Sequence, residues 1–203
     1  MKSHAILVGV LVSAFSITGC NSHEMKTAPV GFLSQPELMK KGSGETWTYT
    51  APNINWSSYT GVYVAPVAIS AGAMDGEVSE NADDLPRLAT TFQNALITAL
   101  TAQYSAAPAA APNVLVIRAQ ITKAQPNKPA RNILPQTQIG GTGYGFGEVA
   151  IEVVDGGTKT VLYEFAGVQN TSRFSSEKMS TWGSLEKSFT TWSTELAKVC
   201  GVK

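Results

Sequence analysis

Histidine is almost absent from this chain. The sequence holds two, His4 and His23, and both precede the segment that we expect to fold. A Ser-His-Asp or Cys-His nucleophilic site therefore lacks its usual base, and a zinc site lacks its usual nitrogen ligands. We expect a protein that is not an enzyme, with no catalytic residue, no metal ligand and no cofactor. Chemistry that needs only carboxylates stays open.

Charged residues are also scarce, and neither sign prevails. Lys and Arg number 15, Asp and Glu number 15, and together they make up only 15% of the 203 residues. Nucleic-acid-binding proteins need a broad basic surface, so the sequence argues against a nucleic-acid partner. Hydrophobic residues make up 43% of the chain, which is enough for the core of one domain. The surface of that domain is expected to be polar but mostly uncharged, which suits an exported protein.

The apolar run near the N-terminus is too short to span a bilayer, which takes about 20 residues. It covers residues 5–12, follows Lys2 and leads into Ile17-Thr18-Gly19-Cys20. This is the layout of a secretory signal peptide, and its last four residues resemble a bacterial lipobox. The resemblance implies cleavage before Cys20 and acylation of that cysteine with chains such as palmitate. An ordinary signal peptide with a free cysteine, or a retained membrane helix, is the alternative.

The predicted domain organisation follows from this signal. Residues 1–19 form the cleaved lipoprotein signal peptide, residues 20–30 the acylated cysteine with a flexible tether, and residues 31–203 a single globular domain. Two or more acyl chains hold a protein on a membrane essentially permanently, because each buried methylene contributes about 0.8 kcal/mol. Asn21 stands where Asp would resemble an inner-membrane retention signal, so we expect an outer-membrane anchor with the domain facing the periplasm.

Disulfide bonds are not expected either. The chain has two cysteines, and once Cys20 carries lipid, Cys200 has no partner within the chain. Cys200 falls near the end of an apolar helical pattern, which favours a small buried side chain over a catalytic thiol.

Hydrophobic periodicity predicts the order of elements β-α-β-loop-β-β-α. Strands are expected at 46–49, 59–67 and 114–122, a hairpin at 148–154 and 160–169, and helices from 83 to 100 and from 180 to 199. Residues 126–147 form a long irregular loop rich in Pro and Gly. The fold class is therefore α+β (mixed α/β): one small domain with a mixed sheet of about four to five strands and two main helices packed on one face.

Two groups of residues in the second half are candidates for a site. Tyr144 and Phe146 stand among glycines and form a possible binding loop, although their packing between glycines that bend the entering strand is the simpler explanation. Glu148 and Glu152 lie on one strand face, about 13 Å apart by strand rise, which is too far for a glycosidase pair. Alternation with Val149, Ile151 and Val153 predicts a solvated outer face for both glutamates. Trp182 and Trp192 are expected in the core.

Several short motifs are similar to one known family. They are Gly31-Phe32-Leu33-Ser34, Tyr59, Val62-Tyr63-Val64-Ala65-Pro66-Val67, Gly147-Glu148-Val149 with Glu152, and Asp155-Gly156. Together they resemble the Gram-negative envelope lipoproteins of domain-of-unknown-function family 3313, over nearly all of residues 31–200. The resemblance implies an envelope lipoprotein without established catalytic residues.

The sequence leaves two hypotheses of function. The first is a non-enzymatic lipoprotein whose domain binds another envelope protein or further copies of itself, supported by the anchor and by two β segments expected at sheet edges. The second is a small-molecule or glycan binder, or a carboxylate-dependent hydrolase, with the 126–147 loop as a lid.

Overall fold

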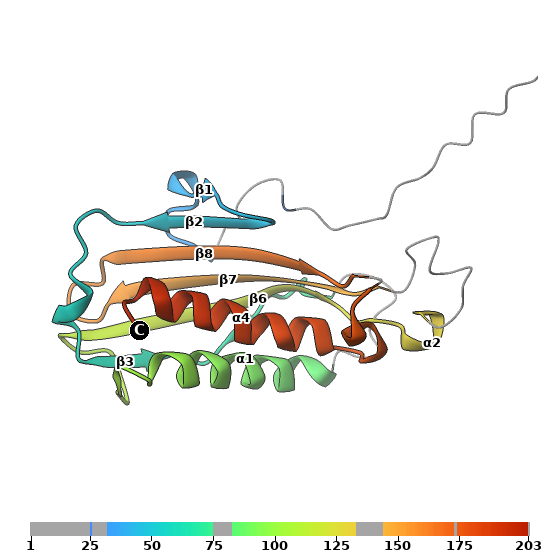
Figure 1. The fold of residues 1–203 in the computed structure, drawn as a ribbon. Coiled ribbons are helices and arrows are strands. Elements are labelled where there is room, and N and C mark those ends of the chain that lie inside the picture. Colours follow the sequence, from blue (N-terminus) through green and yellow to red (C-terminus); the bar gives the residue numbers. More distant parts are fainter. Residues whose placement is uncertain (1–24, 26–31, 75–82, 133–143, 173, 203) are drawn as a thin grey trace, which may run out of the picture.

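The structure is a computed structural model that describes residues 25, 32–74, 83–132, 144–172 and 174–202. The predicted signal peptide and the predicted lipidation site Cys20 lie outside these residues. The described chain forms one mixed α+β domain, in which two long helices cover one face of a single sheet (Figure 1). Within the described residues no helix is both long enough and apolar enough to cross a membrane.

Eight strands make up the sheet that the structure describes. Their order is β1-β2-β8-β7-β6-β3-β5, and β4 also pairs with β6. Strands β3 and β4 run parallel to β6. The pairs β6–β7, β7–β8 and β8–β2 are antiparallel. The strands are β1 (Lys40–Lys41), β2 (Thr46–Thr50), β3 (Gly61–Val64), β4 (Ala68–Ile69), β5 (Ser105–Ala106), β6 (Val114–Gln125), β7 (Phe146–Asp155) and β8 (Val161–Asn170).

The helices include the two that were predicted. They are η1 (Pro36–Leu38), η2 (Trp56–Ser58), α1 (Leu85–Leu100), α2 (Pro129–Asn132), η4 (Ser176–Met179) and α4 (Gly183–Val199). The hairpin of β7 and β8 and the central position of β6 are also confirmed.

The expected four to five strands are too few. Five strands, β2, β3, β6, β7 and β8, are the ones that periodicity predicted, whereas β1, β4 and β5 have two residues each. Alternation cannot be seen in two residues, so these strands leave no pattern in the sequence. The predicted strand 59–67 is shorter in the structure, since β3 spans Gly61–Val64 and β4 begins only at Ala68, after the predicted strand.

The main core lies between the sheet and the two long helices. Phe92 of α1 and Phe189 of α4 stack there with ring centroids 4.5 Å apart. Trp182 and Trp192 are buried in the same core, as expected. Cys200 is fully buried too, and burial raises the pKa of its thiol to about 12, so the thiol stays protonated and unreactive at neutral pH.

The turn between β7 and β8 is fixed by one carboxylate. Asp155 Oδ1 accepts hydrogen bonds from the backbone N–H groups of Gly157 (2.8 Å) and Thr158 (2.7 Å). Its other oxygen accepts one from the hydroxyl of Tyr59, also at 2.7 Å. Tyr59 and Asp155-Gly156, two of the motifs noted in the sequence, therefore act together to hold the segment before β3 against this turn.

We expect Tyr59→Phe to lower the free energy of unfolding by roughly 1 kcal/mol at pH 7, because a hydrogen bond to a charged acceptor is lost. The bonds from Thr158 and then from Tyr59 hold the pKa of Asp155 below its usual value. Their stabilisation is thus present above the pKa of the unfolded state and disappears as the pH falls through the lower folded value. Urea unfolding measures the change, and Tyr49→Phe is the control. Equal stability of the Tyr59→Phe variant and the wild type would contradict the assignment.

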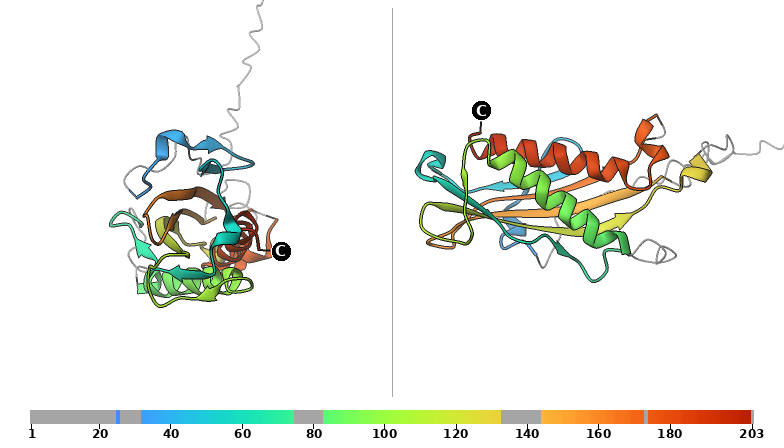
Figure 2. Two further views of the ribbon diagram at one scale, coloured as in Figure 1. Left: turned by 90° about the vertical axis from the view of Figure 1, so that its left-hand side faces the viewer. Right: turned by 90° about the horizontal axis from the view of Figure 1, so that it is seen from below.

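The opposite face of the sheet carries a second, smaller core. Seen end-on, the helices lie on one side of the curved sheet and the segment around β1 on the other (Figure 2). We call residues 32–39 the N-terminal segment. Its buried side chains Leu33 and Met39 pack in a cluster with Ala150, Ala166 and Val168 of the hairpin. The N-terminal segment therefore covers part of the face that the helices leave free.

Candidate functional site

A row of polar side chains crosses four strands on the face that the helices do not cover. The strand register aligns Tyr49 of β2 with Glu164 of β8, Glu164 with Glu152 of β7, and Glu152 with Arg118 of β6. Directly opposed residues project from the same face of a sheet. Two carboxyl groups and one guanidinium group thus come from neighbouring positions in the middle of the sheet.

Both carboxyl groups in this row are withdrawn from water. Glu152 and Glu164 are 0% exposed, and Glu148 on the same face is 6% exposed. The predicted solvated outer face for Glu148 and Glu152 is therefore wrong. The reason is that the N-terminal segment lies over this face. No local sequence pattern indicates that this segment packs against the hairpin.

Backbone N–H groups of the N-terminal segment point at the two carboxyl groups. The N–H of Ser34 lies 2.7 Å from Glu164 Oε1 and 3.1 Å from Glu152 Oε1, and it donates to both. The N–H of Gln35 donates to Glu164 Oε1 at 2.9 Å. We call Arg118, Glu152 and Glu164, with the backbone of Ser34 and Gln35, the carboxylate clamp.

Arg118 supplies the positive charge of the clamp. Its Nη2 lies 2.5 Å from Glu152 Oε2, and its guanidinium carbon lies 5.9 Å from the centre of the Phe32 ring. Burial raises the pKa of Glu164, and the neighbouring Glu152 adds to that effect, while the Gln35 and Ser34 N–H groups oppose it. The Arg118 charge balances one of the two carboxyl groups, so a proton on Glu164 lets both remain buried without repulsion.

The clamp is suited to holding the chain rather than to transforming a substrate. Each carboxyl group accepts hydrogen bonds from the protein's own backbone and is shielded from solvent. A substrate could reach either glutamate only after the N-terminal segment had moved. Ser34, whose N–H donates to both glutamates, belongs to Gly31-Phe32-Leu33-Ser34, the most distinctive motif in the sequence; Gly31 itself lies outside the described residues.

The sequence analysis singled out neither Glu164 nor Arg118 of the clamp. Glu164 lies within an apolar strand, between Tyr163 and Phe165, where a lone carboxyl group is costly unless it has partners. The hairpin was recognised, and its register pairs Glu164 with Glu152. Two acidic residues that face each other across a buried hairpin would have indicated that something covers and binds them.

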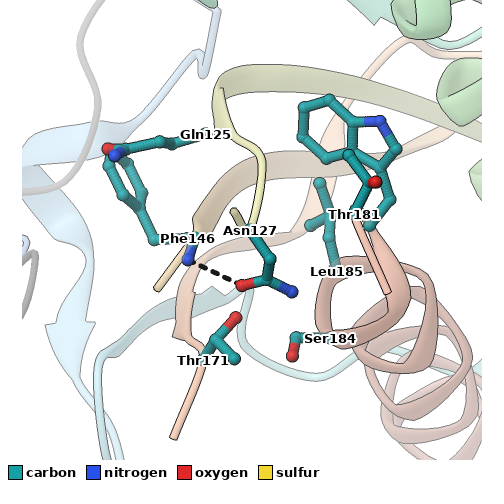
Figure 3. A pocket seen from close by; sticks show the side chains of 9 residues that line it. Gln125, Asn127, Phe146, Thr171, Thr181, Ser184 and Leu185 are labelled. Carbon is teal, nitrogen blue, oxygen red and sulfur yellow. Dashed lines mark hydrogen bonds between the residues drawn. The ribbon is translucent and has the colours of Figure 1, made fainter. Parts of the chain in front are cut away.

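The second candidate region lies at the end of the sheet where β7 begins. Phe146 lines a small pocket there, together with Gln125, Thr171 and Thr181 among others (Figure 3). Its enclosed space of about 10 Å³ holds roughly one water molecule, whereas ligand pockets usually enclose about 300–1,000 Å³. Tyr144 is half-buried and does not line it. The binding role of Tyr144 and Phe146 stays a prediction, and residues 133–143 of the supposed lid lie outside the described residues.

Asn127 organises this region. Its Oδ1 accepts a hydrogen bond from the Gly145 N–H at 2.7 Å, and its Nδ2 donates to the carbonyl oxygens of Ser180 (2.7 Å) and Glu177 (3.1 Å). The side chain is 4% exposed. One buried amide thus ties the end of β6 to the approach to β7 and to the loop before α4, which favours a structural over a binding role for these residues.

Residues 29–196 match the family model "Protein of unknown function (DUF3313)", and the chain belongs to this family. The match includes the N-terminal segment and every residue of the carboxylate clamp. The resemblance noted from the short motifs is thereby confirmed. No curated protein matches the chain.

Three solved structures illustrate the wider likeness. The PelC dodecamer from Paraburkholderia phytofirmans is 14% identical, with 78% of this chain and 97% of that chain covered and a TM-score of 0.47. A DUF4136 family protein from Bacteroides thetaiotaomicron is 13% identical, with 78% and 97% covered and a TM-score of 0.43. A DUF330 protein from Xanthomonas campestris is 12% identical, with 75% and 92% covered and a TM-score of 0.42. Likenesses at this level say nothing about what this chain does.

Proposed function

We propose that this protein is a non-enzymatic accessory lipoprotein of the bacterial cell envelope. Acyl chains on Cys20 anchor it in the outer membrane, and its domain faces the periplasm and binds another envelope protein or further copies of itself. The observation that carries the proposal is the carboxylate clamp, because it fixes the chain that leaves the predicted anchor directly to the middle of the sheet.

The path between the anchor and the domain is short. Met25 is 5% exposed, and its carbonyl oxygen accepts a hydrogen bond from the Trp47 indole N–H at 3.3 Å. Met25 lies five positions after Cys20, and an extended chain spans at most about 3.6 Å per residue, or roughly 18 Å in all. A domain held this close to a lipid surface is suited to presenting a fixed face to a partner in the envelope.

The two edges of the sheet limit how a partner can bind. The edge strands β1 and β5 have two residues each, all exposed, and β1 consists of Lys40 and Lys41. Short edges and lysines on an edge hinder indiscriminate strand addition. Partner binding is therefore expected to use side-chain surfaces more than an added strand.

Cys20→Ala tests the anchor. We expect the wild-type protein to carry acyl chains by intact mass and to fractionate with outer membranes, and the Cys20→Ala protein to carry none and to leave the membrane fraction. Cys200→Ala is the matched control, because Cys200 is buried and its replacement leaves Cys20 in place. An unmodified, soluble wild-type protein would refute the proposal.

Crosslinking in intact cells tests the accessory role. We expect the acylated protein to yield a defined crosslinked species that contains an envelope protein or a second copy of the chain. Recovery of the monomer alone, with the anchor intact, would overturn this part of the proposal.

A further inference from the structure

The loop between β8 and α4 exposes two large apolar side chains. Phe174 is 83% exposed and Met179 is 50% exposed. In the sequence Arg173 precedes Phe174 and Lys178 precedes Met179. Large apolar residues beside basic ones are typical of segments that lie at the boundary between lipid headgroups and acyl chains.

The position of this loop in the fold is defined by the strand register. Asn170, the last residue of β8, is paired with Phe146, the first residue of β7, and Thr46 at the start of β2 is paired with Gly167. The loop therefore leaves the sheet at the end where β2 and β7 begin and β8 ends. Figure 1 shows α2 at the same end and the C-terminus at the other.

The chain that leads to the predicted anchor approaches the same end. Met25 lies within hydrogen-bond distance of the indole of Trp47, and Trp47 is the second residue of β2. Cys20 lies at most about 18 Å from Met25, by the reach of five extended residues. Acyl chains on Cys20 would thus bring the lipid surface to the end of the domain that carries Phe174 and Met179.

We propose that Phe174 and Met179 insert into the interfacial layer of the membrane and give the domain a second, non-covalent contact beside the acyl anchor. This inference rests on the acylation of Cys20 in the proposed function. The anchor alone would leave the domain free to rotate about its attachment. Two contacts fix which end faces the lipid and leave the opposite end, with the β7–β8 turn and the C-terminus, directed away from it.

The test uses the full-length acylated protein in vesicles of phosphatidylethanolamine and phosphatidylglycerol. An environment-sensitive fluorophore is attached to Phe174→Cys, and in a separate protein to Gln103→Cys. Gln103 is exposed and lies beyond the C-terminal end of α1, at the opposite end of the domain. Cys200 is buried with a raised pKa and does not compete for the label.

On reconstitution we expect the label at position 174 to brighten at least twofold, to shift to the blue and to be quenched by nitroxide groups on the lipid acyl chains. The label at position 103 is expected to keep its emission in water. A label at 174 that stays in water on acylated, vesicle-bound protein overturns this inference alone. Blue-shifted emission without quenching by the lipid nitroxides also overturns it, because a protein and not lipid then covers the loop. An intact mass without acyl chains overturns this inference and the proposed function together.

Discussion

Gly156→Ala is expected to destabilise the fold strongly, whereas Gly157→Ala, one residue further on, is expected to be tolerated. A Cβ atom on Gly156 would lie 2.4 Å from the carbonyl oxygen of Ala111 and 2.6 Å from that of Val114. Both oxygens are backbone atoms, one of them shortly before β6 and the other in its first residue, and they cannot move without displacing the start of the strand. Overpacking usually costs about 1–3 kcal/mol, and we expect Gly156→Ala to reach or exceed the upper value.

The matched control position, Gly157, has more room for a Cβ atom. A Cβ atom on Gly157 would lie 3.3 Å from Asp155 Oδ1 and 3.4 Å from Pro112 Cα, which a small shift relieves. We expect a loss of about 1 kcal/mol or less for Gly157→Ala. Urea unfolding, or the soluble yield if Gly156→Ala does not fold, measures the difference. Equal losses from the two variants would show that the turn is not packed against residues 111–114 in solution.

Glu164→Ala is expected to release the N-terminal segment and to cost up to about 3 kcal/mol. The substitution removes an acceptor shared by two backbone N–H groups, those of Ser34 and Gln35, and hydrogen bonds contribute about 0.5–1.5 kcal/mol each. Hydrogen exchange at the Ser34 and Gln35 amides is expected to become faster while the amides of β6 stay protected. Unchanged exchange at both amides would refute the role assigned to Glu164.

Glu164→Gln is the matched variant, because its side-chain oxygen can still accept both hydrogen bonds. Its pH dependence gives a second test. The pKa of Glu164 is raised in the folded state, so the folded protein binds the proton more tightly than the unfolded chain does. The stabilisation from this proton is complete below the pKa of the unfolded state and is lost as the pH rises through the raised folded value. Glutamine does not titrate, so the variant is expected to lose this part of the pH dependence.

Regular periodicity made most of the fold predictable from sequence. The helices α1 and α4, the hairpin and the central strand β6 each extend over many residues, and their apolar positions repeat at 3.6 or 2 residues. Strands β1, β4 and β5 were not predicted, because two residues carry no periodic pattern. Each forms only through pairing with a neighbouring strand.

The candidate site was predicted only in its parts. Both the Gly31-Phe32-Leu33-Ser34 motif and Glu152 were singled out, yet Glu152 was assigned to a solvated face. An alternating strand indicates which residues share a face, but it does not indicate what covers that face. Here the cover is a segment with almost no secondary structure of its own, and its bonds to the glutamates use backbone N–H groups that every residue except proline carries.

The clamp also sets an order for folding. The hydrogen bonds from Ser34 to Glu152 and Glu164 join residues that are 118 and 130 positions apart. Residues 32–39 are made well before the hairpin of β7 and β8, and their acceptors exist only after this hairpin has formed. Contacts of such sequence separation are entropically the slowest to close. The first part of the domain to emerge is therefore the last to reach its place, and a chain cut short before β8 lacks Glu164, the acceptor of two of the three hydrogen bonds.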